Sequence, residues 1–253
     1  MKYAVPLALV LVLLVLSNYS VASYTVTHLN VTVQLNKNTS ASVSEILTLH
    51  MSNQSVSQYS TDRLALNLTL STWQTLVGPI LVEHILNPRS GVYNFKFLPG
   101  AAFKNDSGYY AYLMMSYDVN NVTEVNQTGP RSFLYSFNDN VFNFEHGISG
   151  QVLPQNTTLT IVIPQGASIV SVYPVPDMPT TAFTDNYKNV TSVSWMYGEP
   201  LSAFVFKFSL QESIETEVTK FFYGVYNYFG YSIFAILIIL IILILLYIYL
   251  RVK

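Results

Sequence analysis

The sequence predicts a mainly β protein: a β-sandwich-like ectodomain of one or two lobes, followed by a C-terminal stalk and a transmembrane α-helix. Short runs alternate apolar and polar residues with a period of two, and Gly, Pro or Asn turns separate them at near-regular spacing. The chain ends on the uncharged apolar run 229–250, which has the ~20 residues that a helix needs to cross a membrane. Cysteine is absent, which excludes disulfides and Cys-based zinc or redox sites.

Residues 1–22 are predicted to be a secretory signal peptide. A short positive segment precedes the apolar run 6–16, and Ser20 and Ala22 place small residues at the −3 and −1 positions of a cleavage site. Two alternatives are open. An uncleaved anchor would leave both chain ends inside, and an archaeal pilin leader would require a long apolar helix directly after cleavage, whereas the chain becomes polar at Ser17.

Residues 23–118 are predicted to form a β-rich lobe with a short helix. In its first run, the odd-numbered positions from Thr25 to Leu35 share a more apolar face and the even-numbered positions share the other, as in a half-buried strand. The strands expected in this lobe are 24–35 and 41–50, which form a hairpin, and 64–70, 92–98 and 109–117. The second run places four residues on one face: Val43, Glu45, Leu47 and Leu49.

A loop over 52–60 and one helix are expected between these strands. Ser71 and Gln74 fit a capping box, so the helix is predicted to begin at Ser71 as its N-cap. It is expected to break near Gly78, and the sequence Asn87-Pro88 ends any continuation.

The polar stretch 119–131 is predicted to be a connector, and a second β-rich lobe is predicted over 132–210; a single lobe is the alternative. The strands expected here are 133–137, 159–163, 168–173, 190–195 and 201–210. The last four are expected to pair as two hairpins, around residues 164–166 and 197–200.

Residues 211–228 are predicted to form a helical stalk that runs without a break into the membrane. Apolar residues recur there at helical spacing: Leu210, Ile214, Val218, Phe221 and Val225. This stripe predicts either a stalk packed on its own ectodomain or a short coiled coil between copies.

Residues 229–250 are predicted to be the transmembrane helix, because only a helix or a closed barrel satisfies backbone polar groups in lipid. Arg251 and Lys253 follow the run, and basic residues stay on the cytoplasmic side. The tail 251–253 is therefore expected in the cytoplasm, and the rest of a single-pass type I protein of the cell membrane is expected outside the cell.

The strongest surface signal is the N-x-[ST] sequon, which marks a glycan acceptor on an exported chain. Nine acceptors are predicted: Asn30, Asn38, Asn53, Asn67, Asn105, Asn121, Asn126, Asn156 and Asn189. A tenth, Asn18, would be removed with the signal peptide. Asn30 lies within a predicted strand and is expected to point to solvent.

No motif for catalysis, a cofactor or a metal occurs in the sequence, so neither an enzyme nor a cofactor is expected. The histidines, His28, His50, His84 and His146, are dispersed, and neither HExxH nor a phosphate-binding loop is present. A glycosidase-type carboxylate pair from distant segments stays open. The net charge is −2 and there is no basic block, so we expect no nucleic-acid partner.

Residues 153–177, the later stretch from Trp195 to Phe204 and the acidic segment before the apolar run resemble uncharacterised single-span surface glycoproteins of thermoacidophilic, Sulfolobus-like archaea. The resemblance covers 156–253 best and implies no established activity. Sparse charge with abundant Tyr, Asn, Ser and Thr is consistent with an acidic exterior, where carboxylates are protonated and neutral polar groups and sugars supply the solvation.

Together these patterns predict a membrane-anchored extracellular glycoprotein with a structural or recognition role at the cell envelope. The expected partners are the lipid bilayer, N-linked glycans and an envelope or membrane protein, which includes a second copy of the chain. Two alternatives are an accessory subunit that docks on a multi-span membrane complex and an ecto-hydrolase.

Overall fold

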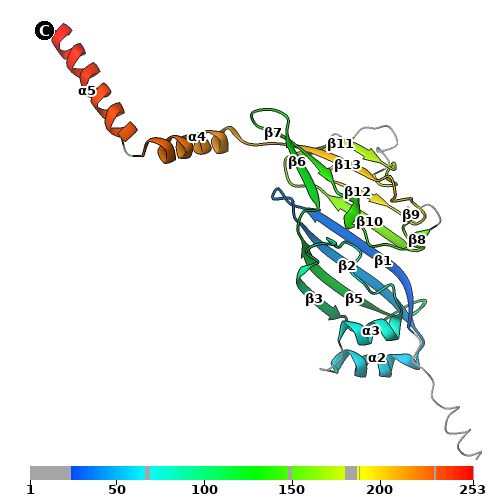
Figure 1. The fold of residues 1–253 in the computed structure, drawn as a ribbon. Coiled ribbons are helices and arrows are strands. Elements are labelled where there is room, and N and C mark those ends of the chain that lie inside the picture. Colours follow the sequence, from blue (N-terminus) through cyan, green and yellow to red (C-terminus); the bar gives the residue numbers. More distant parts are fainter. Residues whose placement is uncertain are drawn as a thin grey trace, which may run out of the picture.

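The computed structural model describes residues 24–65, 69–147, 150–179, 187, 189–230 and 232–252. The protein is mainly β, as the sequence predicts, with its strands in several sheets. These strands and two short helices form one body, called the β body below, from which two C-terminal helices extend (Figure 1). The predicted signal peptide, 1–22, and the predicted acceptor Asn67 lie outside the described residues.

The larger sheet, called sheet A, is built around the predicted hairpin, which is confirmed as β1 (Tyr24–Leu35) and β2 (Ala41–Met51). Its order is β12-β10-β1-β2-β5-β3, with β4 paired on β5. β10 runs parallel to β1, with Leu29 opposite Thr157. The other strands of sheet A are β3 (Tyr93–Pro99), β4 (Phe103–Asn105), β5 (Gly108–Val119), β10 (Thr157–Val162) and β12 (Ser192–Trp195).

The smaller sheet, called sheet B, has the antiparallel order β11-β13-β7-β6. Its strands are β6 (Thr123–Gln127), β7 (Ser132–Phe137), β11 (Ala167–Tyr173) and β13 (Val205–Gln211). Between β7 and β10 the chain forms the 3-10 helix η1 (Asp139–Val141) and a two-stranded ribbon of β8 (His146–Gly147) and β9 (Gly150–Gln151).

Strands are present near all five positions predicted in the C-terminal half, but the two hairpins predicted from the last four are wrong. β10 and β12 pair with each other in sheet A, whereas β11 and β13 pair in sheet B, so each predicted hairpin is divided between the sheets. A Pro/Gly turn determines where the chain changes direction. It does not determine which sheet the next strand joins, because side-chain packing against neighbouring strands decides that.

The predicted connector, 119–131, contains β6 and does not separate the two sheets. β10 and β12 belong to the predicted second lobe, 132–210, yet they pair with strands of the predicted first lobe, 23–118. One hydrophobic core joins both sheets, since Trp195 of β12 contacts Phe206 of β13 with ring centroids 6.3 Å apart.

A β-bulge between Val26 and His28 changes which side chains of β1 face the core. Beyond the bulge Leu29 is buried, as predicted. Before it, Tyr24 is buried and Thr25 is exposed, so the prediction that Thr25 shares a face with Leu29 is wrong. The extra residue of a bulge reverses the alternation of the strand.

The predicted helix after Ser71 is confirmed as α3 (Leu70–Val77), but a second helix, α2 (Ser55–Leu64), stands where a loop is predicted. α2 occupies most of the predicted loop 52–60, and α3 begins at the last residue of the predicted strand 64–70. The predicted strand is therefore wrong at Leu64 and Leu70, and its central residues, 66–68, lie outside the described residues. Buried aromatic side chains stabilise the helices instead: Tyr59 of α2 and Trp73 of α3 contact each other and Tyr24 of β1.

The cap of α3 also differs from the prediction. Thr69 is the N-cap rather than Ser71, and its hydroxyl accepts a hydrogen bond from the Thr72 backbone N–H at 3.5 Å. The helix ends at Val77, where Gly78 with φ +100° confirms the predicted break. Segment 79–92 then crosses the sheet without helical structure and buries Leu81 and Ile85.

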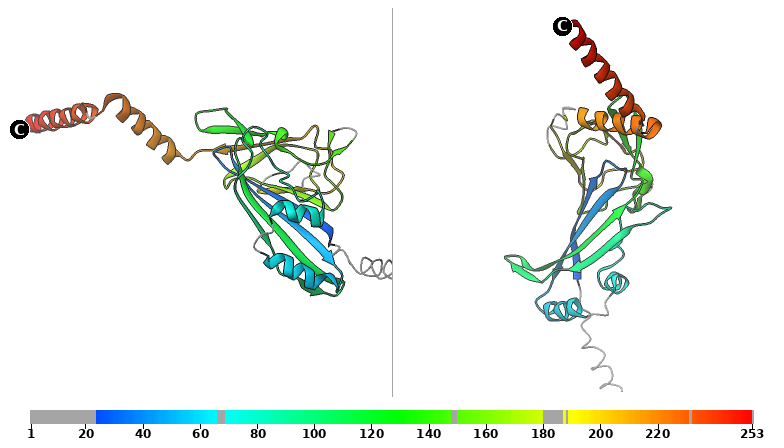
Figure 2. Two further views of the ribbon diagram at one scale, coloured as in Figure 1. Left: turned by 60° about the horizontal axis from the view of Figure 1, so that its bottom comes forward. Right: turned by 90° about the vertical axis from the view of Figure 1, so that its left-hand side faces the viewer.

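Among the described residues, only one side of sheet A is covered (Figure 2). Helices α2 and α3, segment 79–92 and sheet B pack on the side that carries Leu29, Val31 and Trp195. The opposite side, called the open side, is lined by polar, aromatic, sulfur-containing and aliphatic side chains, which include Asn30, Thr32, Ile46, Thr48, Tyr110, Tyr112, Met114, Thr158 and Thr160.

Two helices follow sheet B: α4 (Ile214–Phe229) and α5 (Ser232–Val252). Ser213 caps α4, and the helix ends at Phe229. Gly230 follows with a φ of +58° and interrupts the predicted continuous helix. The two helices run in different directions in both figures. Within the described part of the chain, no helix combines the length and the apolar character required to cross a membrane.

Candidate functional site

Eight of the nine predicted glycan acceptors lie in the described part of the chain, and none of these eight is fully buried. Asn30 is half-buried. Seven acceptors are exposed: Asn38, Asn53, Asn105, Asn121, Asn126, Asn156 and Asn189. Five of the seven lie in turns or loops, Asn105 is the last residue of β4, and Asn126 lies on β6, the edge strand of sheet B. The acceptors are therefore distributed over the β body rather than gathered at one site.

Three of these asparagines also have a backbone role. Asn121, Asn156 and Asn189 have φ values of +54°, +58° and +61°, in the left-handed region that Asn tolerates better than most residues. A turn requirement alone therefore accounts for asparagine at these three positions. At exposed acceptors without a positive φ, such as Asn126, turn formation does not explain the asparagine. These positions therefore test glycan attachment more directly.

Asn30 is the acceptor on the open side of sheet A. It lies between Thr158 of β10 and Ile46 of β2, and its Oδ1 is 2.9 Å from Nε2 of His28. The side chain points away from the core, as predicted for a mid-strand acceptor. A glycan attached here would extend over the open side.

A buried polar cluster joins Glu45 of β2, Tyr117 of β5 and His84 of segment 79–92. The Glu45 carboxylate is fully buried and accepts hydrogen bonds from the His84 ring nitrogen Nδ1 at 2.7 Å, from the His84 backbone N–H at 2.8 Å and from the Tyr117 hydroxyl. The Tyr117 hydroxyl in turn accepts from the Ile85 N–H at 3.2 Å. Burial, and then the neighbouring Glu45 carboxylate, raise the pKa of Tyr117.

This cluster anchors segment 79–92 on sheet A. On its other side the segment holds the residues after β7, because the Leu86 N–H donates to the Val141 carbonyl at 2.7 Å and the Asn143 N–H donates to the His84 carbonyl at 2.8 Å. The ring of Phe144 covers His84, with centroids 5.0 Å apart. Glu45 and His84 resemble a catalytic pair in composition, but their burial and shared hydrogen bonds give them a structural role.

The sequence contained a signal for this cluster. Glu45 is the one carboxylate on the predicted apolar face with Val43, Leu47 and Leu49, and a charged residue on such a face requires a buried partner. The partner, 39 residues away, could not be identified from spacing.

The remaining histidines are separate from each other, as predicted. His28 lies beside Asn30, His50 contacts the Tyr110 ring at 5.1 Å, and His146 is exposed on β8. Among the described residues, no group of three or more His, Asp or Glu side chains is arranged to hold a metal ion.

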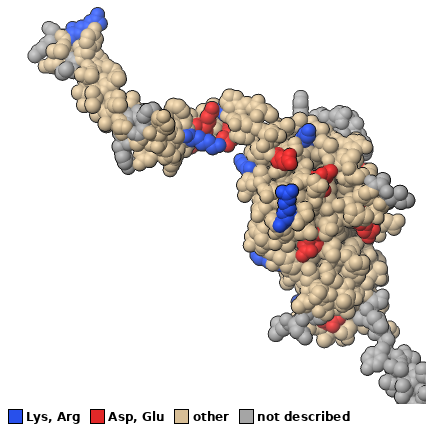
Figure 3. Space-filling view, viewed as in Figure 1, with Lys and Arg blue, Asp and Glu red and all other residues tan. Residues whose placement is uncertain are grey.

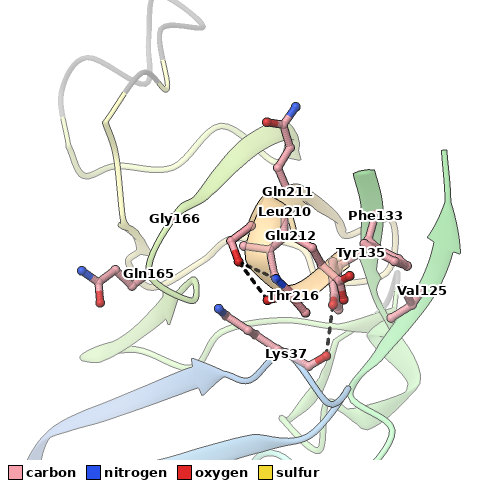
Figure 4. Close-up of a pocket in the computed structure, with 11 residues that line it drawn as sticks. Lys37, Val125, Phe133, Tyr135, Gln165, Gly166, Leu210, Gln211, Glu212 and Thr216 are labelled. Atoms are coloured by element: carbon pink, nitrogen blue, oxygen red, sulfur yellow. Dashed lines mark hydrogen bonds between the residues drawn. The ribbon is translucent and has the colours of Figure 1, made fainter. Parts of the chain in front are cut away.

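A groove of about 450 Å³ lies where the β1–β2 turn, sheet B and the start of α4 meet (Figure 4). Its walls include Lys37, Val125, Phe133, Tyr135 and Thr216. The Tyr135 hydroxyl donates to the Lys37 carbonyl at 3.0 Å, and burial together with a nearby carboxylate raises the pKa of Tyr135. The groove joins segments that are far apart in the sequence, so sequence analysis did not find it.

Charged residues gather where α4 leaves the β body (Figure 3). The Arg131 guanidinium donates to the Glu212 carbonyl at 2.6 Å and lies 3.4 Å from the Glu217 carboxylate. The Lys220 ammonium donates to the Glu212 carboxylate at 2.6 Å and lies 6.0 Å from the centre of the Phe133 ring. These contacts direct the polar side of α4 toward the β body.

No protein-family model and no curated protein matches the sequence. Among solved structures, the chain is similar to the folded domain of the Mycobacterium tuberculosis protein LppM, determined by NMR, with 10% sequence identity. The match covers 79% of this chain and 96% of that chain, with a TM-score of 0.27. A similarity at this score carries no argument about fold or function.

Proposed function

We propose that the protein is a membrane-anchored extracellular glycoprotein with a non-enzymatic structural or recognition role at the cell envelope. The β body, a β-sandwich-like arrangement of sheets A and B, would stand outside the cell. The observation that carries the proposal is the exposure of the acceptors, because seven of the eight described sequon asparagines can be reached from solvent. The uncharged run 229–250 supports a membrane anchor from sequence alone.

A non-enzymatic role agrees with the buried cluster. Glu45 and His84 form a close pair of ionisable side chains inside the β body, and both residues are at most 3% exposed. The ring of Phe144 and the hydrogen-bonded segment 79–92 cover them in the folded chain.

The test is glycopeptide mass spectrometry of the protein from its native membrane. We expect glycans on most of the described acceptors, and we expect Asn126→Gln to lose the mass of one glycan. Asn140→Gln is the matched control, because Asn140 is exposed but is not part of a sequon. The proposal fails if every acceptor is bare, or if protease added to intact cells leaves the β body uncut.

A second candidate function is an accessory subunit on a multi-span membrane complex. The groove beside α4 favours it, since its aromatic walls and the Lys37 side chain offer a docking position at the end of the β body from which α4 extends. Crosslinking on intact cells separates the two candidates. A polytopic partner would support the accessory subunit, and self or coat crosslinks would support the first proposal.

A further inference from the structure

The sequence predicts that the apolar stripe of α4 packs either on its own ectodomain or on a second copy of the chain. The structure excludes the first alternative. A stalk packed on its own ectodomain would bury the stripe, yet Ile214, Val218 and Phe221 are 64%, 46% and 65% exposed. A polar side of the helix, which carries Glu217 and Lys220, contacts the β body instead. Polar contacts to Arg131 and Glu212 explain this orientation, because they hold Glu217 and Lys220 toward sheet B.

The apolar face of α4 is wide, and all of it except the half-buried Val225 is exposed. Ile214, Val218, Phe221 and Val225 follow one another at steps of 4, 3 and 4, and Phe222, 56% exposed, widens the stripe on one side. A two-stranded coiled coil needs a narrower seam of two residues per heptad. A helix with bulky apolar residues on one side and charged residues on the other is typical of one that lies along a membrane surface.

The position of α4 in the chain also favours lipid over a second copy. The helix ends at Phe229, and after the turn at Gly230 no charged residue occurs until Arg251. The positive φ of Gly230 lets the two helices take different directions, so α4 can lie flat while the next segment enters the bilayer. A coiled coil that continued into the membrane would not contain this break.

We propose that α4 is an interfacial helix that lies on the outer leaflet with Ile214, Val218, Phe221 and Phe222 in the lipid, and that it holds the β body against the membrane surface. This rests on the proposed anchoring of the chain by 229–250. At about 1.5 Å per residue, the 16-residue helix would cover ~24 Å of surface. The groove beside α4 would then lie close to the lipid headgroups.

The absence of cysteine makes a direct test available, because one introduced cysteine can carry a spin label without background. The full-length protein would be placed in phosphatidylcholine vesicles with labels at Val218→Cys and Phe222→Cys on the apolar side. Thr219→Cys and Tyr223→Cys are matched controls on the same turns, both exposed, away from the centre of the stripe. Ile241→Cys reports on the predicted membrane segment.

The readout is the accessibility of each label to oxygen, which concentrates in lipid, and to a water-soluble nickel chelate. We expect the apolar-side labels to be several-fold less accessible to the chelate than the control labels, with the reverse order for oxygen. Equal chelate access on both sides of α4 overturns the proposal, as does spin–spin broadening at 218 and 222 that disappears on dilution with unlabelled protein. The label at 241 distinguishes failure of the membrane anchor from failure of the interfacial helix. If this label is in lipid while the labels on α4 are in water, the proposed anchor is supported and only the proposed interfacial helix is wrong.

Discussion

The carboxylates of Glu45 and Glu212 each accept a short hydrogen bond from a basic side chain, Glu45 from His84 at 2.7 Å and Glu212 from Lys220 at 2.6 Å. Their surroundings differ. The Glu45 and His84 side chains are 0% and 4% exposed, whereas those of Glu212 and Lys220 are 25% and 61% exposed. Water can replace the exposed contact between Glu212 and Lys220, but it cannot replace the buried contact between Glu45 and His84. The two pairs therefore differ in their effect on stability although their hydrogen bonds are of similar length.

The largest effect is expected when the buried acceptor is removed. In Glu45→Ala the His84 ring, the His84 N–H and the Tyr117 hydroxyl all lose their partner, and breaking such a buried pair costs about 3–5 kcal/mol of unfolding free energy. Urea unfolding followed by circular dichroism measures it. Glu124→Ala, at an exposed position on β6, is the control and should change stability by less than about 0.5 kcal/mol. Equal losses in the two variants would contradict the comparison.

A smaller loss is expected for Tyr117→Phe, which keeps the ring in the core and removes only the hydroxyl. The Glu45 carboxylate and the Ile85 N–H would each lose one hydrogen bond, at a cost of about 1–3 kcal/mol. The same unfolding measurement applies. Tyr112→Phe, on the open side, should be close to neutral because Tyr112 is 42% exposed. A neutral Tyr117→Phe would mean that water reaches the cluster.

Burial also predicts a loss of stability in alkali. Burial raises the pKa of Tyr59 to about 12, from 10.0 in the unfolded chain. The contribution of the buried Tyr59 hydroxyl to the unfolding free energy is therefore fully present below pH 10. It is lost as the pH rises from 10 toward 12, because Tyr59 has already released its proton in the unfolded chain but not in the folded one. After allowance for solvent screening we expect about 1–2 kcal/mol. The measurement is the unfolding free energy from pH 8 to 12, and the slope should be shallower in Tyr59→Phe than in the unmodified protein.

The smallest effect is expected at the exposed pair. Lys220→Ala removes the contact with Glu212, and an exposed ion pair contributes about 0.2–1 kcal/mol at most. Salt should abolish this difference, because exposed charges are screened within about 8 Å at physiological ionic strength. A loss comparable to that of Glu45→Ala, or one that persists in molar salt, would show that α4 is held to the β body more tightly than its exposure implies.

The comparison also shows which features could be predicted from the sequence. The hairpin of β1 and β2 is local, with five residues between its strands, and the alternating pattern placed both strands correctly. Glu45 was visible as a charge on an apolar face. His84 was not its evident partner, since only the fold brings residues 39 positions apart into contact.

Features that depend on distant contacts were not predictable. The pairing of β10 with β1, and the division of the predicted hairpins between the sheets, follow from the packing of both sheets around one core. The bulge at Val26 and the N-cap at Thr69 each depend on the position of a single residue. The periodicity of apolar residues does not determine such positions. The groove beside α4 joins four separate segments and leaves no continuous signal.

The parallel pairing of β1 with β10 affects the time at which the protein can fold. Leu29 meets Leu47 within the hairpin but meets Thr157 on its other edge, more than a hundred residues later in the chain. Until that segment has been synthesised, one edge of β1 stays unpaired and is open to association with other chains. Such non-local pairing makes folding slow, so a chain that stops before β10 should aggregate rather than form a smaller stable domain.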